Sequence, residues 1–187
     1  MESVRTFISL NISEPVKGKL ALVQKDVISA LSSYRVKWEN PKKFHLTLRF
    51  LGELNSAEIK DLARDLGKIR TGFEHIVYFS DSVGFFPNAK YPNVVFVDLV
   101  EKGTSCAGLV EEIDKVIAEY GIKPDKPFVP HVTMGRFRRD RRQALASEIS
   151  VEVPKMEIVF ENFHLMKSNL IQSGSEYEEI KSYKFKL

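Results

Sequence analysis

Hydrophobic and polar residues alternate along several stretches of this chain, the pattern of a β-strand with one buried face. The first stretch runs from residue 3 to residue 11, where Val4, Thr6, Ile8 and Leu10 alternate with the residues between them. The same pattern predicts further strands at residues 35–38, 44–50, 73–86, 94–100, 131–137, 156–167 and 177–187.

Apolar residues recur every three or four positions between these strands, as on the buried face of a helix. The first helix begins at Ser13, a residue type that caps helix N-termini, has Pro15 in its first turn, and runs to about residue 32. Further helices are predicted at residues 57–69, 104–120 and 141–149.

The order of these elements repeats. Residues 1–90 and residues 91–187 each run strand, helix, extended link, strand, helix, strand. We therefore expect one domain over residues 1–187 with an α+β fold. In this fold two pseudo-symmetric lobes, each an antiparallel sheet with outer helices, surround a central cleft. A pseudo-two-fold axis would bring corresponding strands of the halves face to face.

Composition indicates the class of protein and its expected location in the cell. Hydrophobic residues make up 43% of the 187 residues and charged residues 28%, as in a soluble globular protein. No apolar run reaches the ~18 residues of a membrane span, and Met1–Arg5 contains no signal-peptide core, so we expect a cytoplasmic protein and no membrane partner. The single Cys106 cannot form an internal disulfide, and packing is a simpler role for it than catalysis. A monomer is the default expectation.

Two predicted strands contain the same short motif. His45-Leu46-Thr47-Leu48 is followed 86 residues later by His131-Val132-Thr133-Met134. With four histidines and five threonines, chance alone gives roughly 0.1 His-x-Thr pairs in a chain of this length. Residues two apart on a strand lie on the same face, about 7 Å apart along it. Each motif therefore offers one imidazole and one hydroxyl to the same side.

Basic residues gather directly after the second motif. The net charge is only +3, but the run from Arg136 to Arg142 contains five arginines in seven residues. Such a run can steer a polyanion toward a neighbouring site, and it can equally be a solvated face. Contact with nucleic acid and simple exposure both stay open.

The alternation of residues along a strand predicts the face on which each nearby arginine lies. Arg49 lies two residues after Thr47 and is expected on the motif face. Arg136 has the opposite parity to Thr133, unless Gly135 forms a β-bulge that redirects it. A phosphate-binding role and a surface role for Arg136 are equally open.

Other aromatic and histidine residues offer weaker signals. Phe7, Phe85, Phe86 and Tyr91 could stack on bases, although core packing is the simpler role for each. The two remaining histidines have no threonine two positions later, and we interpret them as structural or surface residues: they are His75 and His164.

Two histidines and two threonines around one phosphate suit the opening of a phosphodiester. One imidazole can take a proton from water while the other gives a proton to the departing oxygen, since the ordinary pKa of histidine lies near 6.5. The hydroxyls of Thr47 and Thr133 can donate to the non-bridging oxygens. The chain has no His, Cys, Asp or Glu cluster with zinc spacing, so we predict neither a metal nor another cofactor.

These motifs resemble those of the two-histidine phosphoesterase superfamily, and most closely its RNA 2′,3′-cyclic phosphodiesterase branch, also described as 2′–5′ RNA ligase-like. The similarity covers nearly the whole chain and is most specific at residues 38–53 and 128–136; residues 5–8 and 168–177 resemble the family's opening and closing strands. Met134 stands where leucine is more common.

The resemblance implies hydrolysis of 2′,3′-cyclic phosphate ends of RNA or nucleotides to the 2′-phosphomonoester, without a metal. It implies that His45 is the acid, that His131 is the base, and that Arg136 joins the two threonines at the phosphate. The residues alone leave the acid and base assignment open, because the motifs are nearly symmetric. Reverse 2′–5′ ligation would be a secondary activity.

Two alternatives remain at the level of sequence. The same site could act on another nucleotide, such as ADP-ribose 1″,2″-cyclic phosphate or a 2′–5′ oligonucleotide. The chain could also be a non-catalytic RNA-binding module that uses its arginine run and aromatic residues. Replacement of His45 and His131 separates a catalyst from a binding module.

Overall fold

Two antiparallel sheets form the framework of the computed structural model, which describes residues 3–103, 105–124, 126–138, 144–145, 149–171 and 174–186. The first sheet has the strand order β3-β1-β8-β9, with the bounds His45–Asn55, Ser3–Asn11, Asn162–Ile171 and Gly174–Lys184. The second sheet has the order β2-β6-β5-β4-β7, with the bounds Val36–Trp38, His131–Phe137, Val94–Glu101, Ile76–Phe86 and Glu157–Phe160.

Within the described residues, three α-helices and one 3-10 helix connect the strands. Their bounds are Glu14–Ala30 for α1, Pro41–Lys43 for η1, Ser56–Leu66 for α2 and Ser105–Ala118 for α3. The start of α2 shows why the sequence becomes helical there. Asn55 accepts hydrogen bonds from the backbone N–H groups of Ala57 and Glu58, and Glu58 accepts one from Asn55 in return. Ser13 occupies the N-cap of α1, but its side chain makes no capping hydrogen bond.

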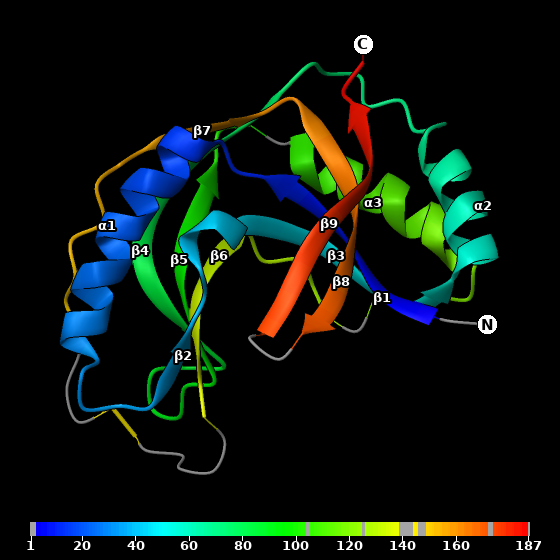
Figure 1. Ribbon diagram of the computed structural model, residues 1–187. Coiled ribbons are helices and arrows are strands. Elements are labelled where there is room, and N and C mark those ends of the chain that lie inside the picture. Colours follow the sequence, from blue (N-terminus) through cyan, green and yellow to red (C-terminus); the bar gives the residue numbers. More distant parts are fainter. Residues whose placement is uncertain are drawn as a thin grey trace.

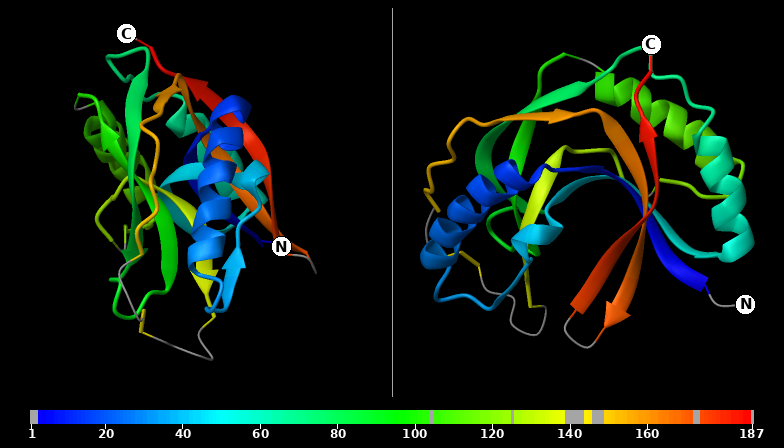
Figure 2. Two further views of the ribbon diagram at one scale, coloured as in Figure 1. Left: turned by 90° about the vertical axis from the view of Figure 1, so that its left-hand side faces the viewer. Right: turned by 45° about the horizontal axis from the view of Figure 1, so that its top comes forward.

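The helices cover different sheets. Figure 1 shows α1 over the second sheet on one side of the molecule and α2 and α3 over the first sheet on the other, and Figure 2 shows the same division in two further views. Gln24 of α1 donates to the backbone of β6, while the hydroxyl of Tyr183 in β9 donates to Ala63 in α2 at 2.9 Å. The predicted α+β fold of two antiparallel sheets with outer helices is confirmed.

Each sheet takes strands from both halves of the sequence. In the first half, β1 pairs with its own motif strand β3 and, on its other edge, with β8 from the second half. In the second half, β5 pairs with its own motif strand β6 and, on its other edge, with β4 from the first half. The final strands of the two halves are therefore exchanged between the sheets. Residue 90 is the boundary between the two sequence repeats, but it is not a boundary between the two sheets.

Some predicted elements differ from those observed. Residues 156–167 form two strands rather than one, because the chain leaves the second sheet after Phe160 and enters the first at Asn162. Phe160 and Phe163 are both buried, each beneath a different sheet, so the two-residue alternation is interrupted at Glu161. Most of the helix predicted at residues 141–149 lies outside the described residues.

The core joins the inner faces of both sheets. Ile8, Leu10 and Leu46 from the first sheet and Val97 and Val132 from the second are fully buried. Each such aliphatic side chain contributes about 1.5–3 kcal/mol of hydrophobic free energy relative to an exposed one. The residues between them along each motif strand point to the opposite face, and this alternation presents the histidines and threonines.

Over the part of the chain that the structure describes, none of the helices is both long and apolar enough to cross a membrane.

Candidate active site

The first motif lies at the start of β3. His45 pairs with Asn11 and Thr47 pairs with Ser9 across the β1–β3 ladder, while Leu46 pairs with the buried Leu10. Directly paired residues of an antiparallel sheet point to the same side. His45 and Thr47 therefore share the face opposite to the core, as the motif predicts.

The second motif has the same arrangement on the second sheet. His131 pairs with Asp98 and Thr133 pairs with Phe96 across the β5–β6 ladder, and Val132 is fully buried. The two motif strands, β3 and β6, contact each other where the sheets meet. Each sheet thus supplies one imidazole and one threonine hydroxyl near this junction.

Both imidazoles make the same backbone hydrogen bond. Nδ1 of His45 lies 2.7 Å from the carbonyl oxygen of Lys43, and Nδ1 of His131 lies 2.7 Å from that of Val129. A carbonyl can only accept, so the proton of each neutral ring resides on Nδ1 and Nε2 remains an acceptor. Thr47 Oγ1 lies 3.0 Å from Nε2 of His45 and donates to it.

Aromatic rings hold the imidazoles in place. The ring centroids of Phe7 and Tyr177 lie 5.2 Å and 5.3 Å from that of His45. Phe86 and Phe96 lie 5.0 Å and 5.2 Å from His131. These contacts shield the rings from water and limit their rotation, which are the conditions for a shifted pKa.

Burial lowers the pKa of His45 from 6.5 to about 4, and the carbonyl of Lys43 opposes this shift. Burial also lowers the pKa of His131, with the carbonyl of Val129 and the carboxylate of Asp98 opposing it. The charge of His131 lowers the pKa of His45, and the charge of Arg136 lowers both. The two imidazoles and Arg136 thus lie within electrostatic range of one another.

A β-bulge overturns the parity expected for Arg49. Leu48 is an extra residue opposite the Ile8–Ser9 step of β1, so Arg49 pairs with Ile8 on the core side of the sheet. There its guanidinium makes two hydrogen bonds to Asp114 of α3, at 2.6 Å and 2.8 Å. Arg49 is therefore not on the motif face, where Phe50 takes its place opposite Phe7.

The equivalent bulge redirects Arg136. Met134, rather than Gly135, is the extra residue in β6, so Gly135 pairs with the buried Val95 and Arg136 pairs with Val94. The bulge returns Arg136 to the face of His131 and Thr133. Its side chain is 54% exposed, and its Nε lies 3.8 Å from a carboxylate oxygen of Glu39. Arg138 is exposed, whereas Arg139, Arg141 and Arg142 lie outside the described residues.

Several residues near the imidazoles were not anticipated from the sequence. The amino group of Lys43 donates to the carbonyl of Ser175 and lies 6.0 Å from the ring centroid of Tyr177, which links η1 to β9. Burial raises the pKa of Tyr177, Glu39 raises it further and Arg136 opposes the shift. Tyr177 belongs to the first sheet and Arg136 to the second, so no local pattern could have associated them.

Gly84 of β4 explains how Phe96 can reach His131. A Cβ atom at Gly84 would lie 2.4 Å from the Phe96 ring and 2.9 Å from a carboxylate oxygen of Asp98. The missing side chain leaves room for Phe96 to stack on Phe86, with ring centroids 4.1 Å apart, and to make an edge contact with His131.

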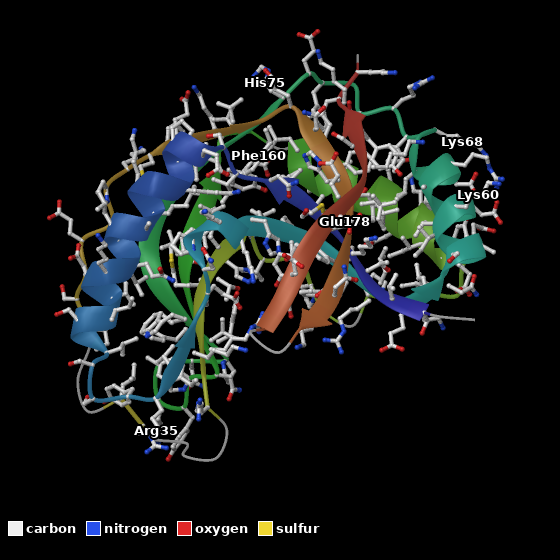
Figure 3. The ribbon with its side chains drawn as sticks, in the orientation of Figure 1. Arg35, Lys60, Lys68, His75, Phe160 and Glu178 are labelled. Carbon is white, nitrogen blue, oxygen red and sulfur yellow. The ribbon has the colours of Figure 1, made fainter. Side chains whose placement is uncertain are left out.

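The remaining candidates take different positions. Figure 3 shows His75 at the outer edge of the molecule, and its side chain is exposed. His164 lies on the motif face of the first sheet, opposite Ser9, and its Nδ1 is 2.8 Å from the carboxylate of Glu179.

The remaining aromatic candidates and the cysteine lie elsewhere. Tyr91 is exposed, and Phe85 packs on Phe137. Cys106 is buried, and burial raises the pKa of its thiol to about 12.

Among the residues that the structure describes, no group of three or more His, Cys, Asp or Glu side chains is arranged to hold a metal ion.

Comparison with protein families gives a match over most of the chain. The LigT like Phosphoesterase family matches residues 10–96 and 99–177. An RNA 2′,3′-cyclic phosphodiesterase of Thermotoga maritima is 27% identical over 184 residues, which are 97% of this chain and 96% of that protein. A protein of the same name from Methanothermobacter thermautotrophicus is 26% identical over 186 residues, which are 97% and 98% of the two chains.

Solved structures share the fold. The protein TT0787 of Thermus thermophilus superposes with a TM-score of 0.75 at 27% identity, over 97% of each chain. LigT of E. coli in complex with 3′-AMP superposes with a TM-score of 0.76 at 20% identity, over 100% of each chain. At 20% identity, this second likeness is one of fold.

Proposed function

This chain belongs to the LigT-like phosphoesterase family, and we propose that it opens 2′,3′-cyclic phosphates at the ends of RNA or nucleotides to give 2′-phosphomonoesters. The observation that supports this most is the pairing of two equivalent imidazoles. His45 and His131 are each anchored at Nδ1 by a carbonyl two residues earlier, and each has a threonine on the same face.

Acid–base catalysis follows from this arrangement. His131 Nε2 takes a proton from a water molecule, whose oxygen forms a bond to phosphorus while the bond to O3′ breaks. His45 supplies the proton that O3′ needs as it departs. After turnover His131 is protonated and His45 is neutral, and exchange with solvent restores both rings. Thr47, Thr133 and Arg136 stabilise the charge that develops on the non-bridging oxygens.

The environments of the two rings suit these roles. The carboxylate of Asp98, paired with His131, stabilises the imidazolium that forms when His131 accepts a proton. His45 has the pKa of a strong imidazolium acid, about 4 in the free protein. The negative charge of bound phosphate raises this pKa and lets His45 hold a proton until O3′ departs. The reverse sequence of steps joins a 2′,3′-cyclic end to a 5′-hydroxyl, so 2′–5′ ligation is a secondary activity of the same site.

Incubation with adenosine 2′,3′-cyclic phosphate in the presence of EDTA tests the proposal. We expect the 2′-phosphate, identified by phosphorus NMR, and a loss of several orders of magnitude in rate for His45→Ala and for His131→Ala. His75→Ala, at an exposed histidine away from the motifs, is the matched control and should retain the wild-type rate. A 3′-phosphate product, or a strict requirement for an added metal, would contradict the proposal.

Assays with other substrates, and RNA-binding measurements, test the alternatives. Turnover confined to ADP-ribose 1″,2″-cyclic phosphate or to a 2′–5′ oligonucleotide would keep the site and change the substrate. RNA binding that survives both histidine replacements, without turnover, would indicate a binding module, and its affinity should fall with added salt. Cytoplasmic location and a monomeric state stay predictions from the sequence.

A further inference from the structure

One buried amide connects α1 to the strand that bears Arg136. Gln24 is 4% exposed and lies among Leu20, Val23 and Val27, the apolar buried residues of α1. Its Nε2 donates to the carbonyl oxygen of Met134 at 2.9 Å and to that of Glu39 at 2.8 Å. Both N–H groups of the amide are therefore used, which offsets the free energy of burying them.

The carbonyl that Gln24 contacts belongs to the bulge of β6. Met134 is the extra residue, and its oxygen also accepts the backbone N–H of Glu39 at 2.9 Å. A bulge leaves one residue of a strand without a partner in the ladder, so its polar groups need other partners. Gln24 and Glu39 supply partners for the carbonyl of Met134.

The bulge decides where Arg136 points. Without the extra residue, strict alternation would put Arg136 on the face opposite to Thr133. Glu39, whose carboxylate lies 3.8 Å from Arg136 Nε, has its own backbone held by the same amide. A single side chain thus fixes the backbone beneath both members of this ion pair.

We propose that Gln24 is a positioning residue for the phosphate site: by holding the Met134 bulge and the Glu39 backbone, it keeps Arg136 on the face of His131 and Thr133. This inference rests on the proposed function, in which Arg136 binds the phosphate. Gln24 itself has no contact with the substrate and acts through Arg136.

A double-mutant cycle tests the inference. Gln24→Met has nearly the same shape and no donor, so it preserves packing while it releases both carbonyls. We expect a loss of about 10-fold in affinity for inorganic phosphate, followed by phosphorus NMR titration, and a similar loss in kcat/KM for adenosine 2′,3′-cyclic phosphate. Arg136→Met should have a comparable effect in the wild-type background and less than about a 2-fold further effect beside Gln24→Met.

Val27→Ala is the matched control on the same helix. It removes buried apolar volume and lowers the stability of the fold, but Arg136→Met should have its full effect in that background. If Gln24→Met does not fold, Gln24→Asn replaces it, since an amide one methylene shorter cannot reach both carbonyls.

Two results would overturn the inference. One is an undiminished effect of Arg136→Met in the Gln24 variant, which would leave Gln24 as a packing residue. The other is a wild-type protein that binds no phosphate, since there would be no phosphate site to position. The phosphate titration is independent of turnover. A wild-type protein that binds phosphate without hydrolysing the cyclic nucleotide would therefore disprove the proposed function, while the cycle would still decide the role of Gln24.

Discussion

At the scale of single residues, the two imidazoles differ in the side chain paired across the strand. Asn11 lies opposite His45, and Asp98 lies opposite His131. The backbone anchor and the neighbouring threonine are common to both. A carboxylate favours the protonated form of an imidazole and an amide does not, so the difference between Asn11 and Asp98 suits the different roles proposed for the two histidines.

The pH dependence of kcat/KM reports these environments. We expect a bell-shaped profile with its maximum below pH 6.5, because one ring must be protonated and burial lowers the pKa of both. Asp98→Asn removes a charge that raises the pKa of His131, so the limb of the profile that reports His131 should move to lower pH. Initial rates from about pH 4 to pH 8 measure this. Asp61→Asn, at an exposed position on α2, is the control, and an unmoved limb in Asp98→Asn would refute the argument.

Stability should also depend on the protonation of His45. Its pKa is about 4 in the folded protein and near 6.5 in the unfolded chain, so below pH 6.5 the unfolded chain binds a proton that the folded chain does not. The stability present above pH 6.5 is therefore lost as pH falls toward 4, by up to about 3 kcal/mol. Urea unfolding at several pH values should show this loss in the wild type, and His45→Gln should lack that part of it. Equal pH dependence in both proteins would contradict the assigned pKa.

The threonine hydroxyls should act in the transition state. Thr47→Val and Thr133→Val keep the β-branched shape and lose the donor, and each should lower kcat by about 10-fold to 1000-fold. Thr71→Val is a control, because Thr71 donates to the carbonyls of Phe73 and Lys186 in a loop away from the motifs. It should lower stability and leave kcat unchanged. Wild-type kcat in the double variant of Thr47 and Thr133 would remove the threonines from the mechanism.

At the scale of elements, two bulges give similar strands different chemistry. The extra residues Leu48 and Met134 occupy equivalent positions in β3 and β6. After the bulge, the residues that return to the motif face are Phe50 and Arg136. Phe50 is 62% exposed, so the corresponding places offer an exposed ring on one sheet and a guanidinium on the other.

Gly135 should be essential to the geometry of β6. A Cβ atom there would lie 2.7 Å from Val36 Cγ1 and 2.8 Å from Trp38 Cε3, so Gly135→Ala forces β2 away and should destabilise the protein by about 1–3 kcal/mol. Gly108→Ala in α3 is the matched control. Nothing lies within 4 Å of its Cβ position, and alanine favours a helix by about 1 kcal/mol, so it should stabilise the protein. Urea unfolding of both variants compares them, and equal stabilities would show that β2 adjusts freely.

Sequence reasoning succeeded where local pattern decides structure and failed where distant segments do. The alternation in β1 predicted its observed bounds, Ser3–Asn11, and the His-x-Thr spacing placed each histidine and threonine on one face. The prediction that Arg49 lies on the motif face was wrong, because the alternation of residues along a strand does not reveal an extra residue in its ladder. Tyr177 escaped notice because its neighbour His45 is more than a hundred residues away in the chain.

At the scale of the whole molecule, the exchange of β4 and β8 makes each sheet depend on both halves. The strands β8 and β9 from the second half complete the first sheet, and β2 and β4 from the first half complete the second. Two helices are exchanged in the same way, since α1 covers the second sheet and α3 covers the first, whereas α2 stays with the first sheet. The motif strands belong to different sheets, and β3 and β6 contact each other where those sheets meet.

The halves should therefore fold only together. A fragment of residues 1–90 keeps the β1–β3 pair but lacks β8, and β4 has lost both of its neighbours, β5 and β7. Edge strands with exposed apolar faces are not stable alone. We expect fragments 1–90 and 91–187 to show no cooperative thermal transition by circular dichroism when they are separate. When they are mixed, structure should return together with the fluorescence of Trp38, the single tryptophan, which packs beneath Gly135 of β6. The intact chain is the control, and a cooperative transition in either isolated fragment would mean that one half is a domain in its own right.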